Sequence, residues 1–221
     1  MDLIGEFSNR VLNDEDLSQK DVATLITDQI AALDDLISEQ LSEIMHDDGF
    51  QAMEGSWRGL SHLVMNTETS TRLKIRLLPA QRSELQKDLD KAVEFDQSNL
   101  FKKIYEDEYG SYGGTPYSLL IGDFYIGRSA PDIAFMEKMA GVAAAAHAPF
   151  LAAASPAMFD MGGFGELGNP RDMAKLFEST ELIKWRSFRD TEDSRYVTLT
   201  LPRVLMRLPC LLYTSDAADD I

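Results

Sequence analysis

The chain has 221 residues, of which 44% are apolar and 26% charged. That length and composition are enough to fill a folded core and are unlike those of a disordered or collagen-like chain. A net charge of −16 argues against sequence-independent binding of nucleic acids, which depends on clustered Lys and Arg. The acidity is concentrated at one end, because the first 50 residues hold 13 carboxylates against only Arg10 and Lys20.

A single cysteine, Cys210, cannot form an internal disulfide, and no secretory signal opens the chain. We therefore expect a cytoplasmic protein. The most apolar run, Ala140–Met158, contains His147 and two prolines, so it predicts a buried helix and strand rather than a membrane span.

Two amphipathic helices are predicted in the acidic N-terminal region. Ser18 and Asp21 have the spacing of a capping box, and an apolar stripe follows them. The residues of this stripe are Val22, Ile26, Ile30, Leu33, Ile37, Leu41 and Ile44. The second stripe consists of Phe50, Met53, Trp57, Leu60 and Val64. Together they predict a helical hairpin that needs a surface to pack on, with Trp57 mostly buried.

From residue 72 the pattern changes to that of an α/β protein. Alternation over Arg72–Pro79 predicts a half-buried strand, and helical patterns follow at 82–95 and 98–107. Further strands are expected at Tyr117–Ile121, Phe150–Ala154 and Tyr196–Leu201, and further helices at Ala130–Ala146, 171–178 and 181–189. Strands separated by helices indicate a mixed, largely parallel sheet with crossover helices. We therefore expect an acidic helical region over 1–69 and an α/β domain over 70–209.

Sequence motifs that would indicate catalysis, nucleotide binding or metal binding are weak or absent. Gly163–Gly168 has the G-x-G-x-x-G spacing, but it does not follow directly on a strand and Asn169-Pro170 comes after it, so a surface loop is favoured over a nucleotide site. The three histidines lack metal-ligand spacing, and no hydrolase elbow or phosphate loop is present. We therefore expect no cofactor and no metal, while the abundant carboxylates leave open that a catalytic pair forms in space.

Aromatic and basic residues that could anchor an interface or a core lie in two segments. Trp57 and Arg58 belong to the second helix, and Trp185, Arg186 and Arg189 lie in a charged segment near the C-terminal end. Acidic neighbours cancel the basic charge of that segment, which favours ion-paired packing or a protein interface over a nucleic-acid site.

Several stretches resemble one family, the large sheath subunit of the type VI secretion system (TssC/VipB, EvpB-like). They are Glu54–Leu60, Asn66–Arg72, Ala92–Gln97, Ala143–Phe150, Glu178–Phe188 and Thr198–Arg203. The resemblance implies a non-enzymatic subunit of a contractile, helical sheath. Its implied partners are a small sheath subunit (TssB/VipA-like), further copies of itself, Hcp-like inner-tube rings and a ClpV-like AAA+ ATPase that disassembles the contracted sheath.

Two differences from the family limit this interpretation. Members continue beyond Pro209, whereas Cys210–Ile221 resembles a translated sequencing adaptor and is expected to contribute nothing to the fold. Members also usually have upstream residues that include a helix read by the ATPase. The alternative from another class is a cytoplasmic α/β enzyme or nucleotide-binding domain that uses the Gly163–Gly168 loop.

Overall fold

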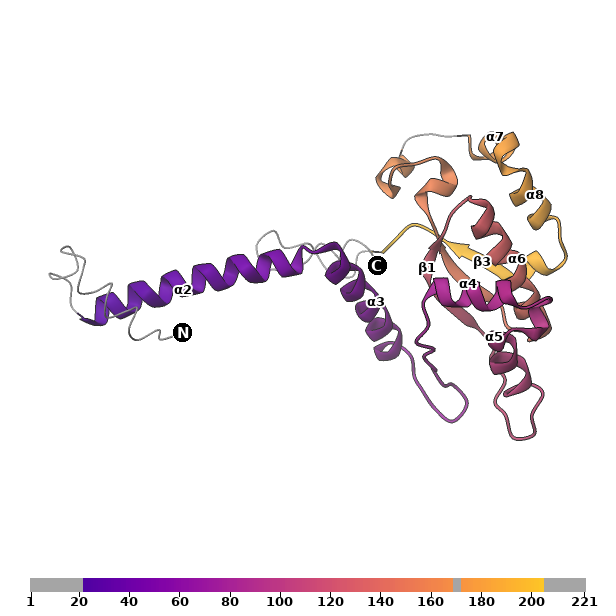
Figure 1. Cartoon of the computed structure of the whole chain (residues 1–221), viewed down its shortest axis with the longest axis horizontal. Helices are drawn as coiled ribbons and strands as arrows, with labels where there is room; N and C mark the ends of the chain where they lie inside the picture. Colours follow the sequence, from indigo (N-terminus) through magenta and orange to yellow (C-terminus); the bar gives the residue numbers. More distant parts are fainter. Residues whose placement is uncertain (1–21, 169–171, 205–221) are drawn as a thin grey trace. The chain divides into compact units, whose positions relative to one another are not determined.

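A computed structural model describes residues 22–168 and 172–204 (Figure 1). The predicted capping box at Ser18 and the predicted non-native segment Cys210–Ile221 lie outside the described residues. The chain divides into two units, Glu68–Arg203 and the residues up to Thr67 together with those from Val204 onward. Each unit is described by itself.

The N-terminal unit contains the two predicted helices, α2 (Val22–Met45) and α3 (Asp48–Met65). The first ends at Met45, and Asp47 caps the second, since its carboxylate accepts a hydrogen bond of 3.0 Å from the backbone N–H of Phe50. No residue of α3 is buried, and the apolar side chains of α2 are largely exposed. The apolar stripes of the two helices therefore remain largely exposed among the described residues.

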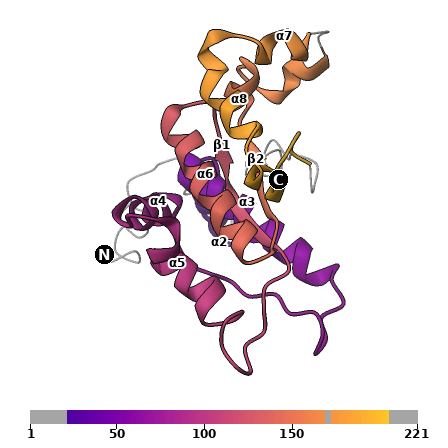
Figure 2. The same cartoon turned by 90° about the vertical axis from the view of Figure 1, so that its right-hand side faces the viewer.

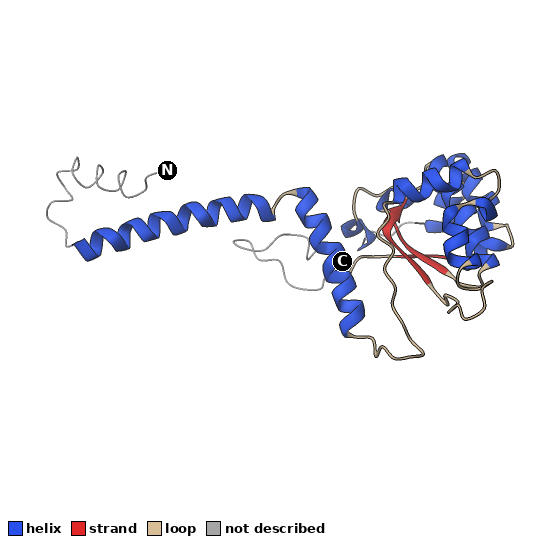
Figure 3. Ribbon diagram, turned by 60° about the horizontal axis from the view of Figure 1, so that its bottom comes forward, coloured by secondary structure: helices blue, strands red, loops and turns tan. Residues whose placement is uncertain are grey.

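The second unit is an α/β domain built on three parallel strands, β1 (Leu120–Ile126), β2 (Phe150–Ala154) and β3 (Val197–Thr200) (Figure 3). The strand order is β1-β2-β3, with Phe150 opposite Leu120 on one side and Val197 on the other. Helices connect successive strands, as parallel pairing requires. The predicted α/β class with a parallel sheet is confirmed.

The core lies between the sheet and α6 (Ala130–Ala145), which packs on β2 and β3. Ser129 caps this helix by accepting from the N–H of Asp132, and Pro131 fits its first turn because the first helical N–H groups have no partner. Ala and Gly along α6 allow a close approach to its neighbours. A Cβ on Gly141 would meet the Phe95 ring at 2.9 Å. Figure 2 shows α4 (Arg82–Lys91) beside α6.

Short helical elements complete the domain. They are η2 (Phe95–Gln97), α5 (Asn99–Phe101), the π-helical turn η3 (Lys102–Glu106), η4 (Pro156–Phe159), η5 (Phe164–Gly168), α7 (Met173–Phe177), η6 (Thr180–Leu182), α8 (Ile183–Arg189) and η7 (Asp193–Tyr196). The helix expected over 82–95 ends at Lys91, because Ala92 is extended.

Two strand predictions are wrong. Residues 73–80 run without a strand partner among the described residues, although their alternation resembles that of a strand. The strand expected at Tyr117–Ile121 was placed too early, because β1 begins at Leu120 and continues through Gly122-Asp123 to Ile126. A register irregularity between Gly122 and Tyr125 accommodates these residues within the β1–β2 pair.

Candidate interaction surfaces

The apolar stripe of α2 is the largest set of exposed apolar side chains on one element. Every member with a described side chain is between 46% and 54% exposed. Leu36, which the sequence analysis did not assign to the stripe, is 62% exposed and lies beside it. Exposed apolar surface of this extent on one helix is typical of an interaction site.

The α3 helix has the same character. Trp57 is 61% exposed and Met53 is 50% exposed, so the prediction that Trp57 is mostly buried is wrong for this chain. Periodicity identified the apolar face correctly but does not say whether the surface that covers it is in the same chain. The neighbouring Arg58 pairs with Glu54 one turn earlier, at 2.5 Å between Nε and Oε1.

Trp185 and Arg186 instead connect parts of the α/β domain. The half-buried Trp185 ring lies 6.3 Å from the Phe177 ring and 5.8 Å from that of Phe188. Arg186 donates hydrogen bonds of 2.8 Å to the carbonyl oxygens of Phe177 and Ser179, just where α7 ends. These two side chains therefore hold α8 against α7.

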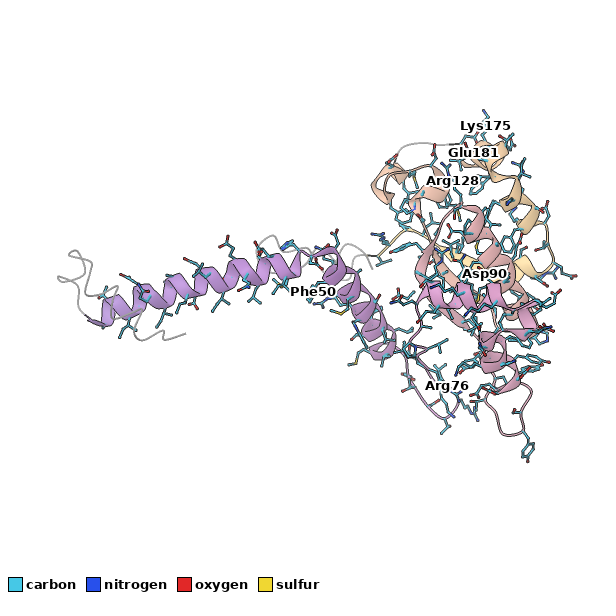
Figure 4. All side chains as sticks on the ribbon, viewed as in Figure 1. Phe50, Arg76, Asp90, Arg128, Lys175 and Glu181 are labelled. Atoms are coloured by element: carbon cyan, nitrogen blue, oxygen red, sulfur yellow. The ribbon has the colours of Figure 1, made fainter. Side chains whose placement is uncertain are left out.

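Arg189 is exposed in the last turn of α8, and Arg128 lies in the loop between β1 and α6. The Arg128 guanidinium bridges Asp160 at 3.1 Å and Glu181 at 3.8 Å (Figure 4). Part of the charge on the segment that contains Trp185 and Arg189 is thus neutralised by an ion pair within the domain. Such exposed ion pairs contribute little to stability.

One face of the sheet is covered and the other is open. Val197 and Leu199 on β3 are partly buried and pack against the core on the side of α6. The opposite face carries Ile121, which is 59% exposed, and Tyr125, which is 37% exposed. The alternation along β2 shows the same division, with Phe150, Ala152 and Ala154 buried and the residues between them half-buried. The predicted strand Tyr117–Ile121 ends before Tyr125, so the sequence did not reveal this face.

The Gly163–Gly168 segment does not form a nucleotide-binding turn. Most of it is the 3-10 helix η5, and η4 separates it from the end of β2. A Cβ on Gly163, Gly165 or Gly168 would meet nothing within 4 Å, so none of these glycines is required by a close approach of the backbone. A dinucleotide site needs a strand that turns directly into a helix, with glycine where the phosphate approaches.

An ion pair and hydrogen bonds hold the segment that precedes α4 against the rest of the domain. Arg76 binds Glu108 and Thr115, and the Glu108 carboxylate also accepts a 2.9 Å hydrogen bond from the Thr115 N–H. The Thr115 N–H and the Arg76 side chain lower the pKa of Glu108 from its usual value. These contacts attach the segment at Arg76 to Glu108 and Thr115, although residues 73–80 belong to no strand.

Sites for other chemistry are not found among the described residues. No three His, Cys, Asp or Glu side chains there lie together in a way that could hold a metal ion. None of the helices described is both long and apolar enough to cross a membrane.

The chain belongs to the VipB family, described as EvpB/VC_A0108, tail sheath N-terminal domain, which residues 27–219 match. The match defines the class of the protein as a tail-sheath protein, of which the family describes the N-terminal domain. A curated relative is the type VI secretion system sheath protein TssC1 of Pseudomonas aeruginosa, which is 48% identical over 204 residues. The alignment covers 91% of this chain and 41% of TssC1, so the chain spans less than half the length of that relative.

Proposed function

We propose that this chain is part of a structural subunit of the contractile sheath of a type VI secretion system and acts by assembly, not by catalysis. The observation that carries the proposal is the family match over residues 27–219. The identity of 48% to a sheath protein supports the same role. A polymer of this kind needs surfaces that remain unsatisfied in the single chain, and the exposed stripes of α2 and α3 have that property.

The proposed role includes specific partners. The subunit pairs with a small sheath subunit of the TssB/VipA type, and the pairs stack with further copies into a helical tube around Hcp-like rings. Contraction of the tube drives the inner tube and its effectors out of the cell, and a ClpV-like ATPase then disassembles the sheath. The sheath itself assembles, contracts and is disassembled in the cytoplasm. Membership of a sheath family supports the pairing with a small subunit and the self-assembly, and the inner tube, the contraction and the ATPase are further parts of the proposal.

Negative-stain electron microscopy tests the proposal. The full-length sheath protein that carries this chain is co-expressed with its small sheath partner, and we expect long tubules. The chain alone, analysed by size-exclusion chromatography, should form none. A pair that stays dimeric under all conditions while the protein binds a labelled nucleotide or turns over a small molecule would replace the sheath with the enzyme alternative.

A further inference from the structure

Charge on α2 is entirely of one sign. Its 24 residues contain five carboxylates and no lysine or arginine. At 100° per residue, Asp34 lies beside one edge of the apolar stripe and Glu43 beside the other, whereas Asp35 and Glu39 lie on the opposite side of the helix. The apolar stripe is therefore flanked on both edges by negative charge.

This pattern limits what can cover the stripe. Helices that pair along apolar stripes choose their partners through the charges beside the stripe, and like charges there repel. A second copy of α2 would bring only carboxylates, and no Lys or Arg, to the edges of the seam. A basic partner would place Lys or Arg beside Asp34 and Glu43, which attracts it and also speeds association.

The geometry points to a partner that is an amphipathic α-helix with Lys or Arg beside its own apolar stripe, docked on the Ile26–Ile44 stripe of α2. This inference deepens the proposed function, on which it rests for the existence of a partner subunit. The charge pattern and exposed fractions of α2 determine the chemistry of that partner. The Ile26–Ile44 stripe offers six apolar side chains, enough for a continuous seam along most of the helix.

Fluorescence anisotropy with two designed peptides tests the inference on the full chain. The peptides share one leucine stripe, and lysine flanks it in the first and glutamate in the second. We expect the lysine peptide to bind at least about tenfold more tightly at low salt. That preference should shrink as salt is raised to about 1 M, since surface charges are then screened within a few ångströms.

Two pairs of variants locate the site. Ile30→Gln with Ile37→Gln places polar groups in the stripe and should weaken binding by about a hundredfold. Ala31→Gln with Ser38→Gln makes the same changes one residue later, outside the stripe, and should leave binding within about twofold of the original. Gln is a good helix former, so circular dichroism should show α2 intact in both proteins.

A second pair tests the charges. Asp34→Lys with Glu43→Lys should reverse the preference toward the glutamate peptide, whereas Asp35→Lys with Glu39→Lys changes net charge equally and should preserve it. The inference is overturned if both peptides bind equally, if neither binds, or if the original chain dimerises through α2 at low salt in sedimentation experiments. If the peptide experiments fail but the full-length pair forms normal tubules, the sheath function stands and only the docking inference is wrong. If the lysine peptide binds as expected but no tubules form, the docking inference stands and the proposed function is wrong.

Discussion

Arg82 and Asp132 join the first residue of α4 to the first turn of α6 across 50 residues of sequence. Their ion pair is only one of the contacts that Asp132 makes, since the same carboxylate accepts from the Gly127 N–H at 3.2 Å and from the Ser129 hydroxyl at 2.7 Å. Arg82 also donates to the Tyr125 carbonyl oxygen at 3.2 Å, and its guanidinium lies 5.6 Å from the centre of the Phe135 ring. One ion pair therefore connects two helices to the end of β1.

Removing this carboxylate should destabilise the α/β domain. Asp132→Ala leaves a partly buried guanidinium and a backbone N–H without their acceptor, and we expect it to lower the free energy of unfolding by about 1–3 kcal/mol. Asp90→Ala is the matched control, because it removes the exposed ion pair with Lys138 and should cost about 0.5 kcal/mol or less. Urea unfolding of the two variants measures the difference. Equal costs would show that the Arg82 pair does not connect the elements.

The two tryptophans should respond differently to substitution. Trp57 is largely exposed on α3, so Trp57→Ala should change the free energy of unfolding by less than about 1 kcal/mol. Trp185 packs between two phenylalanines, and Trp185→Ala should cost about 2–4 kcal/mol. Acrylamide quenching of each single-tryptophan protein should be strong for Trp57 and weak for Trp185. Strong protection of Trp57 in the monomeric chain would contradict its exposure.

Helices and strands that are marked by residues close together in the sequence were predicted correctly. The α6 helix begins at Ala130 as expected because a serine cap and a proline mark its start, and β2 matches its predicted range because the run is short and wholly apolar. Strand pairing is a property of distant residues, so alternation at 73–79 could not reveal that no partner strand lies beside it. The exposure of Trp57 likewise depends on a surface outside the segment that carries the pattern.

Acidification should destabilise the domain partly through Asp88. Burial raises the pKa of this carboxyl, but hydrogen bonds from the Leu100 N–H at 2.9 Å and the Asn99 amide at 2.6 Å outweigh that effect and leave the pKa below its usual value. A lowered pKa in the folded state stabilises the fold above the unfolded pKa of about 3.9, and that contribution is lost as pH falls through the folded value.

Thermal unfolding between about pH 6 and pH 2 measures this contribution. Asp88→Asn should be less stable than the original chain at neutral pH, and its melting temperature should fall less on acidification. Asp96→Asn removes an exposed carboxylate from the same region and serves as the charge-matched control. Parallel pH profiles for the original chain and Asp88→Asn would show that the Asp88 hydrogen bonds do not contribute.

Gly127 has no room for a side chain, whereas Gly163 belongs to a glycine motif but has open space around it. A Cβ on Gly127 would lie 2.8 Å from Asp132 Oδ2, the oxygen that accepts from the Gly127 N–H, so Gly127→Ala should push the carboxylate away and cost about 1–3 kcal/mol. Gly163→Ala, in the segment with G-x-G-x-x-G spacing, meets no atom within 4 Å and should be neutral or slightly stabilising, since alanine restricts the unfolded chain. Urea unfolding compares the two variants. A large loss of stability in Gly163→Ala would show that the glycine segment makes a contact that its open surroundings do not suggest, and would reopen the question of a ligand there.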